Sequence, residues 1–496
     1  MEVIAAIVAW AVQLISQPSN MNNAPFDIQN LTGRLSSGAH IYLPKSSGFE
    51  VATTRWSTFD TPTFRLVVAP STENDVAEVV KYANELNVPF LAVTGAHGAI
   101  TTVGNLHDGI GIWMSALNSV EINHDGSTVT IGGGTLSKSV TDTLWAAGKQ
   151  TVTGICECTS ILGPGLGGGH GALQGRYGLI SDQFVSMNVV LADGTLVTVN
   201  DTEHSDLWWA MRGAGHNFGI VTSLKSRIYD IQHQDWAYQS FIYTGEKTAG
   251  LFETINKNFP RGNQDVEVLH LVIFINNYDV DPTKPLAILY VLQEGVSEVD
   301  AVYTSSFQGL EPIMTTSGSG PYPDLPTWIG ENRDAPSCQK IGQVNIRFPI
   351  DLEFYNVTAV ERAYDLFSTT TQKYPVLNNS IFLFEGYSLQ GVREISSAST
   401  AYPFRQDNYL VSPLITYASE GSEIHDTAIN FGENLRAILH AGSDREELHT
   451  YVNYAFGNEK PQNWYGYEQW RQGRLSALKK RYDPLSRFNF YGPIGV

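Results

Sequence analysis

The chain has 496 residues, 42% of them hydrophobic and 16% charged, so it can bury more apolar surface than one core usually accommodates, and two packed domains are expected. Its formal net charge of −19, with no compensating cluster of Lys and Arg, argues against nucleic-acid binding. The three cysteines, Cys156, Cys158 and Cys338, predict neither a disulfide framework nor a zinc site and are expected to be buried thiols.

An apolar run near the N-terminus, Val3–Ser16, has the length of a signal-peptide core and is too short to span a bilayer. No Lys or Arg precedes it, and no clean small-residue cleavage site follows it. A terminal helix that packs on the fold explains the run equally well. Localisation is therefore left open, secretion included, and a soluble protein without a membrane partner is expected.

Strand, helix, strand and a loop of small residues follow one another from about residue 60. The strands are predicted at Arg65–Ala69 and Val88–Val93, and the helix at Asp75–Leu86, where apolar residues recur at helical spacing. The loop is Thr94–Gly98. This order is typical of the start of an α/β nucleotide-binding domain.

Short strands and helices continue to about residue 223. Asp193-Gly194 between two apolar runs predicts a hairpin, because Asp-Gly is a strong turn signal. The predicted strands are Ile110–Trp113, Ser119–Ile122, Thr128–Ile131, Val185–Leu191, Leu196–Val199 and Gly219–Ser223, and the predicted helices are Leu136–Gly148 and Asp206–Arg212.

The densest glycine tract is Gly163–Gly171, with the sequence GPGLGGGHG. It contains the Gly-x-Gly-x-x-Gly pattern of dinucleotide-binding sites, but a helix should open within that pattern, and glycines cost about 1 kcal/mol each in a helix. We therefore predict a loop that exposes its backbone. Together with Thr94–Gly98 and Gly132–Gly134 it could hold a long ligand through backbone N–H groups. Tight turns alone are the other interpretation.

The character of the chain changes between residues 236 and 449. Strands at Val266–Ile275 and Pro285–Gln293 and helices at Val360–Lys373 and Ser422–Ala441 predict an α+β domain with a sizeable sheet. The last stretch is rich in aromatic residues and contains a predicted helix at Trp470–Tyr482.

Four blocks of sequence occur in an order that resembles one family. They are RLVVAP to His97, Gly154–Asp182, Asp206–Thr222, and YVNY at 451–454 with Tyr482-Asp483-Pro484. The chain resembles the berberine-bridge-enzyme-like branch of the vanillyl-alcohol-oxidase (PCMH-type FAD-binding) flavoproteins. The resemblance implies an α+β fold, with a two-part PCMH-type FAD-binding domain and an α+β substrate domain that has a large antiparallel sheet. The implied boundaries are an N-terminal segment at 1–40, the FAD-binding domain at 41–235, the substrate domain at 236–449 and a C-terminal segment at 450–496 that returns to the FAD-binding domain.

The same resemblance implies FAD as cofactor, attached covalently through His97 to the flavin 8α-methyl and through Cys156 to flavin C6. Imidazole and thiolate are suitable nucleophiles for both bonds. Where relatives often have Arg-Ser-Gly-Gly-His, this chain has Val93 to His97 as VTGAH, which puts the shape of the loop in doubt. The other residues implied to bind the cofactor are Thr94, Gly95, Ala96, Gly98, Gly163, Gly167, Gly168, Asn217, Gly219 and Val221.

The resemblance also points to Tyr454 as the catalytic base, with Tyr451 as a second candidate. A tyrosine can accept a substrate proton if a nearby cation lowers its pKa. Packing within the aromatic tail is the alternative for both residues. His170, next to the glycine tract, is expected to be a structural loop histidine. No metal is implied.

The implied enzyme is an FAD-linked oxidoreductase acting as an oxidase. It transfers a hydride from a small organic molecule, for which a secondary-metabolite intermediate is the first choice, to flavin N5, and O2 then reoxidises the flavin and gives H2O2. Three alternatives stay open. They are an oligosaccharide oxidase, an isomerase or cyclase that keeps FAD without net redox, and an FAD-binding protein without activity.

Overall fold

The computed structural model describes residues 26–419 and 422–495. The apolar run Val3–Ser16 lies outside these residues. Within the described part of the chain, no helix is long and apolar enough to cross a membrane.

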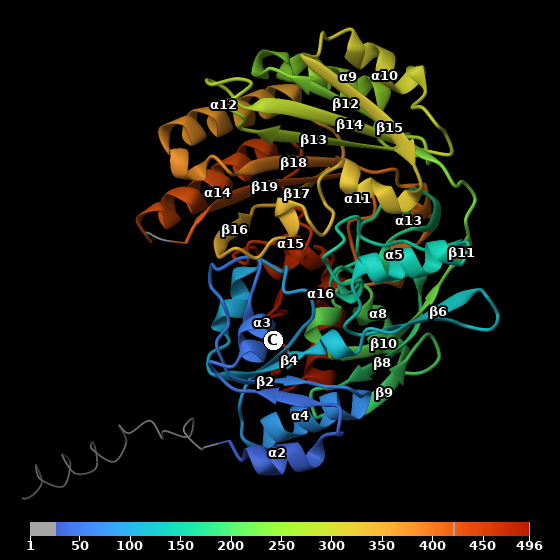
Figure 1. The fold of residues 1–496 in the computed structure, drawn as a ribbon, viewed down its shortest axis with the longest axis vertical. Helices are drawn as coiled ribbons and strands as arrows, with labels where there is room; N and C mark the ends of the chain where they lie inside the picture. Colours follow the sequence, from blue (N-terminus) through green and yellow to red (C-terminus); the bar gives the residue numbers. More distant parts are fainter. Residues whose placement is uncertain (1–25, 420–421, 496) are drawn as a thin grey trace, which may run out of the picture.

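A small mixed sheet forms one end of the molecule (Figure 1). Its strand order is β1-β2-β4-β3, and β2, β4 and β3 are parallel. Helix α4 (Glu73–Glu85) begins at a capping box between Thr72 and Asp75 and buries Val76, Val79 and Val80. The strands are β1 (His40–Tyr42), β2 (Phe64–Ala69), β3 (Phe90–Val93) and β4 (Gly109–Trp113), and the other helices here are α2 (Ile28–Arg34) and α3 (Ser47–Thr53).

A second sheet of five antiparallel strands lies beside the first, in the order β5-β6-β10-β8-β9. The predicted hairpin is confirmed, since β8 and β9 pair around Asp193-Gly194. The strands are β5 (Val120–Ile122), β6 (Thr128–Gly132), β8 (Phe184–Val190), β9 (Leu196–Val199) and β10 (Ile220–Arg227). Around them lie α5 (Ser137–Ala146), α7 (Gln174–Tyr177), α8 (Ser205–Met211) and the short pair β7 (Lys149–Gln150) and β11 (Tyr229–Asp230).

The other half of the molecule is built on an eight-stranded antiparallel sheet (Figure 1). Its order is β15-β12-β14-β13-β18-β19-β16, with β17 also paired to β19. The strands are β12 (Trp236–Tyr243), β13 (Val268–Ile275), β14 (Leu286–Glu294), β15 (Met314–Gly320), β16 (Gln343–Arg347), β17 (Ile350–Leu352), β18 (Ile381–Gly386) and β19 (Tyr409–Ala418). Helices α9 (Thr248–Asn258), α10 (Ala301–Gln308), α12 (Val357–Lys373) and α14 (His425–Ala441) cover one face, while α11 (Leu325–Trp328) and α13 (Gln390–Glu394) lie nearer the first half. The predicted α+β class with a large antiparallel sheet is confirmed.

The C-terminal segment crosses back to the first half of the molecule. Helix α15 (Pro461–Tyr465) is followed by α16 (Gln469–Tyr482), which packs near α8 (Figure 1). The buried Lys479 ammonium donates to the Asn217 carbonyl at 2.9 Å and pairs with Asp483 at 2.7 Å. These bonds fix the returning segment on the turn that precedes β10.

Two expectations from the sequence are wrong in detail. The start of the glycine tract forms a short helix, α6 (Leu162–Leu166), because Pro164 is tolerated in a first turn and both leucines are buried. Only the glycines after it form the predicted loop, with Gly168 at φ 105° and Gly169 at φ 85°. The second error concerns the cysteines, because Cys158 and Cys338 form a disulfide.

Candidate active site

A cavity of about 800 Å³ lies between the eight-stranded sheet and the loops of the first half. The sheet face opposite the helices forms one wall. Alternate residues of each strand point into it, while the residues between them pack under the helices. The wall residues are Leu271, Ile273 and Ile275 on β13, Ile381, Leu383 and Glu385 on β18, Leu414 and Thr416 on β19, and Gln343, Asn345 and Arg347 on β16.

His97 faces the cavity from the loop that follows β3. Its ring stacks on Trp56 with 5.8 Å between centroids. Burial, together with the charges of Lys340 and Arg347, lowers the pKa of His97 to about 4, so the imidazole is neutral near pH 7. A neutral ring has a free nitrogen lone pair and is a nucleophile.

Ala96, which stands where relatives often have glycine, has an unusual backbone conformation in this loop. Ala96 has φ 53°, in the left-handed region that costs an alanine about 1–2 kcal/mol. Its carbonyl accepts a hydrogen bond from the Trp56 amide at 3.1 Å. Gly95 packs on the loop that carries Cys156 and Cys158, because a Cβ on Gly95 would lie 2.9 Å from the Cys158 carbonyl oxygen.

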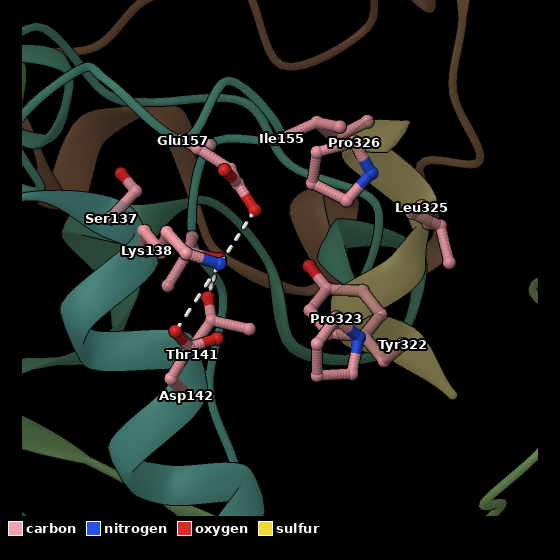
Figure 2. A pocket seen from close by; sticks show the side chains of 12 residues that line it. Ser137, Lys138, Thr141, Asp142, Ile155, Glu157, Tyr322, Pro323, Leu325 and Pro326 are labelled. Atoms are coloured by element: carbon pink, nitrogen blue, oxygen red, sulfur yellow. Dashed lines mark hydrogen bonds and ion pairs between the residues drawn. The ribbon is translucent and has the colours of Figure 1, made fainter. Parts of the chain in front are cut away.

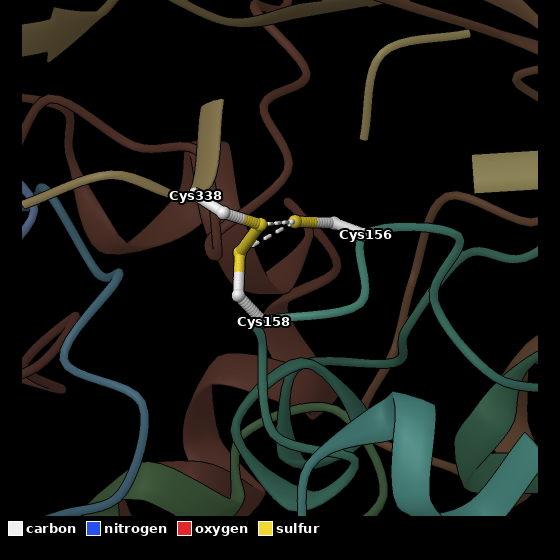
Figure 3. A group of neighbouring side chains, drawn as sticks. All are labelled: Cys156, Cys158 and Cys338. Carbon is white, nitrogen blue, oxygen red and sulfur yellow. Dashed lines mark hydrogen bonds between the residues drawn. A yellow bond between two sulfur atoms is a disulfide. The ribbon is translucent and has the colours of Figure 1, made fainter. Parts of the chain in front are cut away.

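Cys156 is the free cysteine of the described chain and lines the same cavity as His97. Figure 3 shows its sulfur beside the disulfide, 3.3 Å from the Cys158 sulfur and 3.9 Å from that of Cys338. Burial and the nearby Glu331 raise the pKa of the Cys156 thiol, so the thiol is protonated near pH 7. Because two of the three sulfurs are bonded to each other, the cluster does not offer three thiolates to a metal.

The residue between the two loop cysteines anchors their loop (Figure 2). Glu157 accepts from the Lys138 ammonium at 2.9 Å and from the Arg333 amide at 2.9 Å. The hollow beside this pair measures about 20 Å³, about the room that one water needs, so it is no site for an organic ligand. The contacts hold Cys156 at the cavity.

Most of the sequence-predicted cofactor residues are brought together in the cavity wall. Asn217, Gly167 and Gly168 lie behind it. The Asn217 amide donates to the Gly492 carbonyl at 3.0 Å, so it holds the C-terminal segment, and a Cβ on Gly168 would meet Tyr402 at 2.6 Å. Those in the wall are Thr94, Gly95, Ala96, His97, Gly98, Cys156, Gly163, Gly219 and Val221, together with Tyr451 and Tyr454.

Two wall residues that the sequence did not reveal carry polar atoms that have no hydrogen-bond partner among the described residues. The Nε2 of His216 lies 2.8 Å from the Gly163 carbonyl and must donate to it, which leaves Nδ1 as a buried acceptor without a donor. Arg487 donates to the Val88 carbonyl, but its buried Nε has no acceptor. A ligand with hydroxyl and phosphate groups, such as FAD, fits both needs.

The candidate base is part of a buried network. The Tyr454 hydroxyl donates to Glu385 at 3.1 Å, and the Tyr387 hydroxyl donates to the other carboxylate oxygen at 2.6 Å. Burial raises the pKa of Glu385 above its usual value. Burial and Glu385 also raise the pKa of Tyr454, although the Arg347 guanidinium lies 4.1 Å from its ring centroid. A cation therefore lies beside Tyr454, but burial and Glu385 outweigh its lowering effect on the pKa.

Tyr451 and His170 pack together, with ring centroids 4.8 Å apart. Both His170 nitrogens are within hydrogen-bond distance of partners, Gln174 at 2.9 Å and Tyr402 at 3.1 Å, as expected for a structural histidine. Glu385 was missed by the sequence analysis. The sequence did contain a signal for Glu385, because an acidic residue directly follows the apolar run Ile381–Phe384. It also stands two and four residues after Leu383 and Ile381, so all three side chains point to the same face of the strand.

Comparison with known proteins identifies the class to which this protein belongs. Residues 64–200 match the family model described as an FAD binding domain, so the chain is a flavoprotein. An FAD-linked oxidoreductase of Penicillium rubens, chyH, is 48% identical over 100% of this chain and 99% of its own length. Another, chry5 of Gibberella zeae, is 46% identical over 100% and 99%. The chain belongs to the FAD-linked oxidoreductases.

Solved structures share the fold at much lower identity. Physcomitrella patens BBE-like 1 superposes with a TM-score of 0.80 at 19% identity, covering 94% of this chain and 98% of that one. The glucooligosaccharide oxidase of Acremonium strictum gives a TM-score of 0.79 at 17% identity, with the same coverage. The predicted fold class is therefore confirmed.

Proposed function

We propose that FAD is bound bicovalently, through His97 and Cys156, and that the protein is an oxidase of small organic molecules. The observation that carries the proposal is that a neutral imidazole and a free thiol line one large cavity of an FAD-linked oxidoreductase. The structure of the Acremonium strictum enzyme is described as holding 6-S-cysteinyl, 8α-N1-histidyl FAD, which supports the same two linkages here.

Neighbouring groups suit these roles. The Glu331 carboxyl contacts Cys156, and burial raises the pKa of Glu331, so its carboxylate form would be placed to take the proton of the Cys156 thiol. Disulfide-bonded Cys158 has no thiol to offer. Arg487 and the His216 Nδ1 would take phosphate and hydroxyl groups of the cofactor.

Once bound, FAD supplies hydride acceptance at N5 and return of the electrons to O2, which gives H2O2. Tyr454 accepts the proton of a substrate O–H or N–H at its hydroxyl oxygen and passes its own proton to the Glu385 carboxylate. Tyr387 holds the other oxygen of that carboxylate and fixes its orientation. The apolar wall of the large sheet excludes water from this pair.

A secondary-metabolite intermediate is the substrate that suits this wall best. Six of the eleven side chains that the sheet contributes are leucine or isoleucine, whereas a sugar needs a polar surface to bind its hydroxyls. An oligosaccharide oxidase is the second candidate, because several proteins with this fold are named as such. An isomerase or cyclase that keeps FAD is separated from both by turnover without O2 uptake.

Acid precipitation of the purified protein tests the cofactor proposal. We expect yellow colour to stay with the pellet, and peptide mass spectrometry to find flavin on His97 and Cys156. His97→Ala and Cys156→Ala should each leave one bond, and the double variant should release all colour. A colourless protein that takes up no FAD on reconstitution would falsify the proposal.

A further inference from the structure

Arg347 differs from the other arginines of the cavity wall. Arg55 donates to the Gly98 carbonyl at 2.7 Å, and Arg487 donates to Val88. The Arg347 side chain forms no ion pair and no hydrogen bond with any described residue, and its Nη1 is buried without an acceptor. A guanidinium withdrawn from water without an anion is costly, and this one faces the cavity.

Two aromatic rings hold the guanidinium in place. Its central carbon lies 4.1 Å from the centroid of Tyr454 and 5.4 Å from that of Trp56. Its backbone lies in β16, paired with Leu414. The guanidinium N–H groups form no hydrogen bond with the described residues, and a guanidinium with free N–H groups can bind a carboxylate through two parallel hydrogen bonds.

No carboxylate of the described residues neutralises this charge. Glu331 and Glu385 are the acidic groups close enough to interact with Arg347, but neither forms an ion pair with it. The positive charge is therefore left for a ligand, directly beside the hydroxyl–carboxylate pair of Tyr454 and Glu385.

We propose that Arg347 binds a carboxylate of the substrate, while the leucines and isoleucines of the sheet contact the apolar body of the molecule. The inference rests on the proposed function and deepens it, because it names the substrates as apolar carboxylic acids. A neutral oligosaccharide has no anionic group that could neutralise the charge of Arg347. The carboxylate places the oxidised carbon near Tyr454.

Titration calorimetry of the flavin-loaded protein tests this assignment without knowledge of the substrate. The probes are benzoate and 2-naphthoate, compared with the neutral isosteres benzamide and 2-naphthamide. We expect the acids to bind at least tenfold more tightly than the amides. Arg347→Gln should weaken binding of the acids at least tenfold and leave binding of the amides unchanged. Arg347→Lys should bind the acids with intermediate affinity, because lysine keeps the charge but not the paired N–H groups of the guanidinium.

Lys340→Gln is the matched control. Like Arg347, Lys340 lowers the pKa of His97. Lys340 donates to the Thr54 carbonyl and is not part of the cavity wall, so Lys340→Gln should not change the binding of the acids. Flavin content and melting temperature establish that each variant is folded. Failure of both acids to bind, or equal acid binding by Arg347→Gln, overturns the assignment. If the protein carries no flavin, the proposed function fails, while calorimetry still reports on Arg347.

Discussion

Tyr454 shows which properties of a residue the sequence predicts and which depend on its neighbours in the folded protein. The family resemblance pointed to Tyr454 as the catalytic base, and in the structure Tyr454 lines the cavity. The sign of its pKa shift depends on two residues far away in sequence. Arg347 lowers the pKa, but burial and Glu385 raise it more strongly. With a raised pKa, Tyr454 does not act as a base in its ionised form. It instead takes the substrate proton while it passes its own proton to Glu385.

His270 is a second residue whose state depends on burial. It lies on the helix-covered face of β13, stacked on Phe259 with centroids 4.5 Å apart. Neither ring nitrogen has a partner in the part of the chain that the structure describes. Burial lowers the pKa of His270 to about 3. An unfolded chain binds a proton at this histidine below pH 6.5, whereas the folded chain does not until about pH 3, so acid favours unfolding across that window.

His270→Leu should remove this dependence. Between pH 7.5 and 5, the free energy of unfolding of the wild type should fall by about 2 kcal/mol more than that of the variant. Urea unfolding at both pH values, followed by far-UV circular dichroism, measures the difference. Identical pH dependence of the two proteins would show that His270 titrates normally in the fold.

At the scale of elements, helix α16 depends on one buried ion pair. Lys479 and Asp483 are both fully buried, and the three protons of the ammonium go to Asp483, Asn217 and Phe488. Asp483 in turn accepts from the Phe488 amide at 2.8 Å. Removal of the lysine leaves a carboxylate without a counterion and two carbonyls without a donor.

Lys479→Met should destabilise the protein by about 3–5 kcal/mol, the usual cost of breaking a buried pair. Lys480→Met, one residue further along the helix and exposed, is the control and should change stability by less than about 0.5 kcal/mol. Guanidinium unfolding curves of both variants give the comparison. Equal curves would mean that α16 does not depend on the pair.

At the scale of the molecule, the disulfide joins the two halves across the cavity. Cys158 belongs to the loop beside Cys156, and Cys338 lies 180 residues further along, on the loop that also carries Glu331. A crosslink that closes so long a loop restricts the unfolded chain strongly. It also leaves Cys156 as the sole thiol of the cluster.

The double variant Cys158→Ser, Cys338→Ser should lose about 2–4 kcal/mol of stability and keep flavin on Cys156. Thermal unfolding and peptide mass spectrometry measure the two effects. Cys156→Ser, which keeps the disulfide, is the matched control and should lose the thioether without the loss of the crosslink. Migration of flavin to another residue, or an unchanged melting temperature, would contradict this view of the disulfide.

The sequence by itself determined the local elements and the class of the protein. The hairpin at Asp193-Gly194 and helix α4 follow from short-range turn and capping chemistry, and the four blocks that carry the family resemblance contain the two loops with His97 and Cys156. Only the tertiary structure decided which side chains meet. The disulfide of Cys158, the contact of Glu385 with Tyr454 and the position of Arg347 over the Tyr454 ring each bring together residues that are distant in the sequence. Burial in the folded protein also shifts the pKa values of such residues, and no local sequence pattern encodes these shifts.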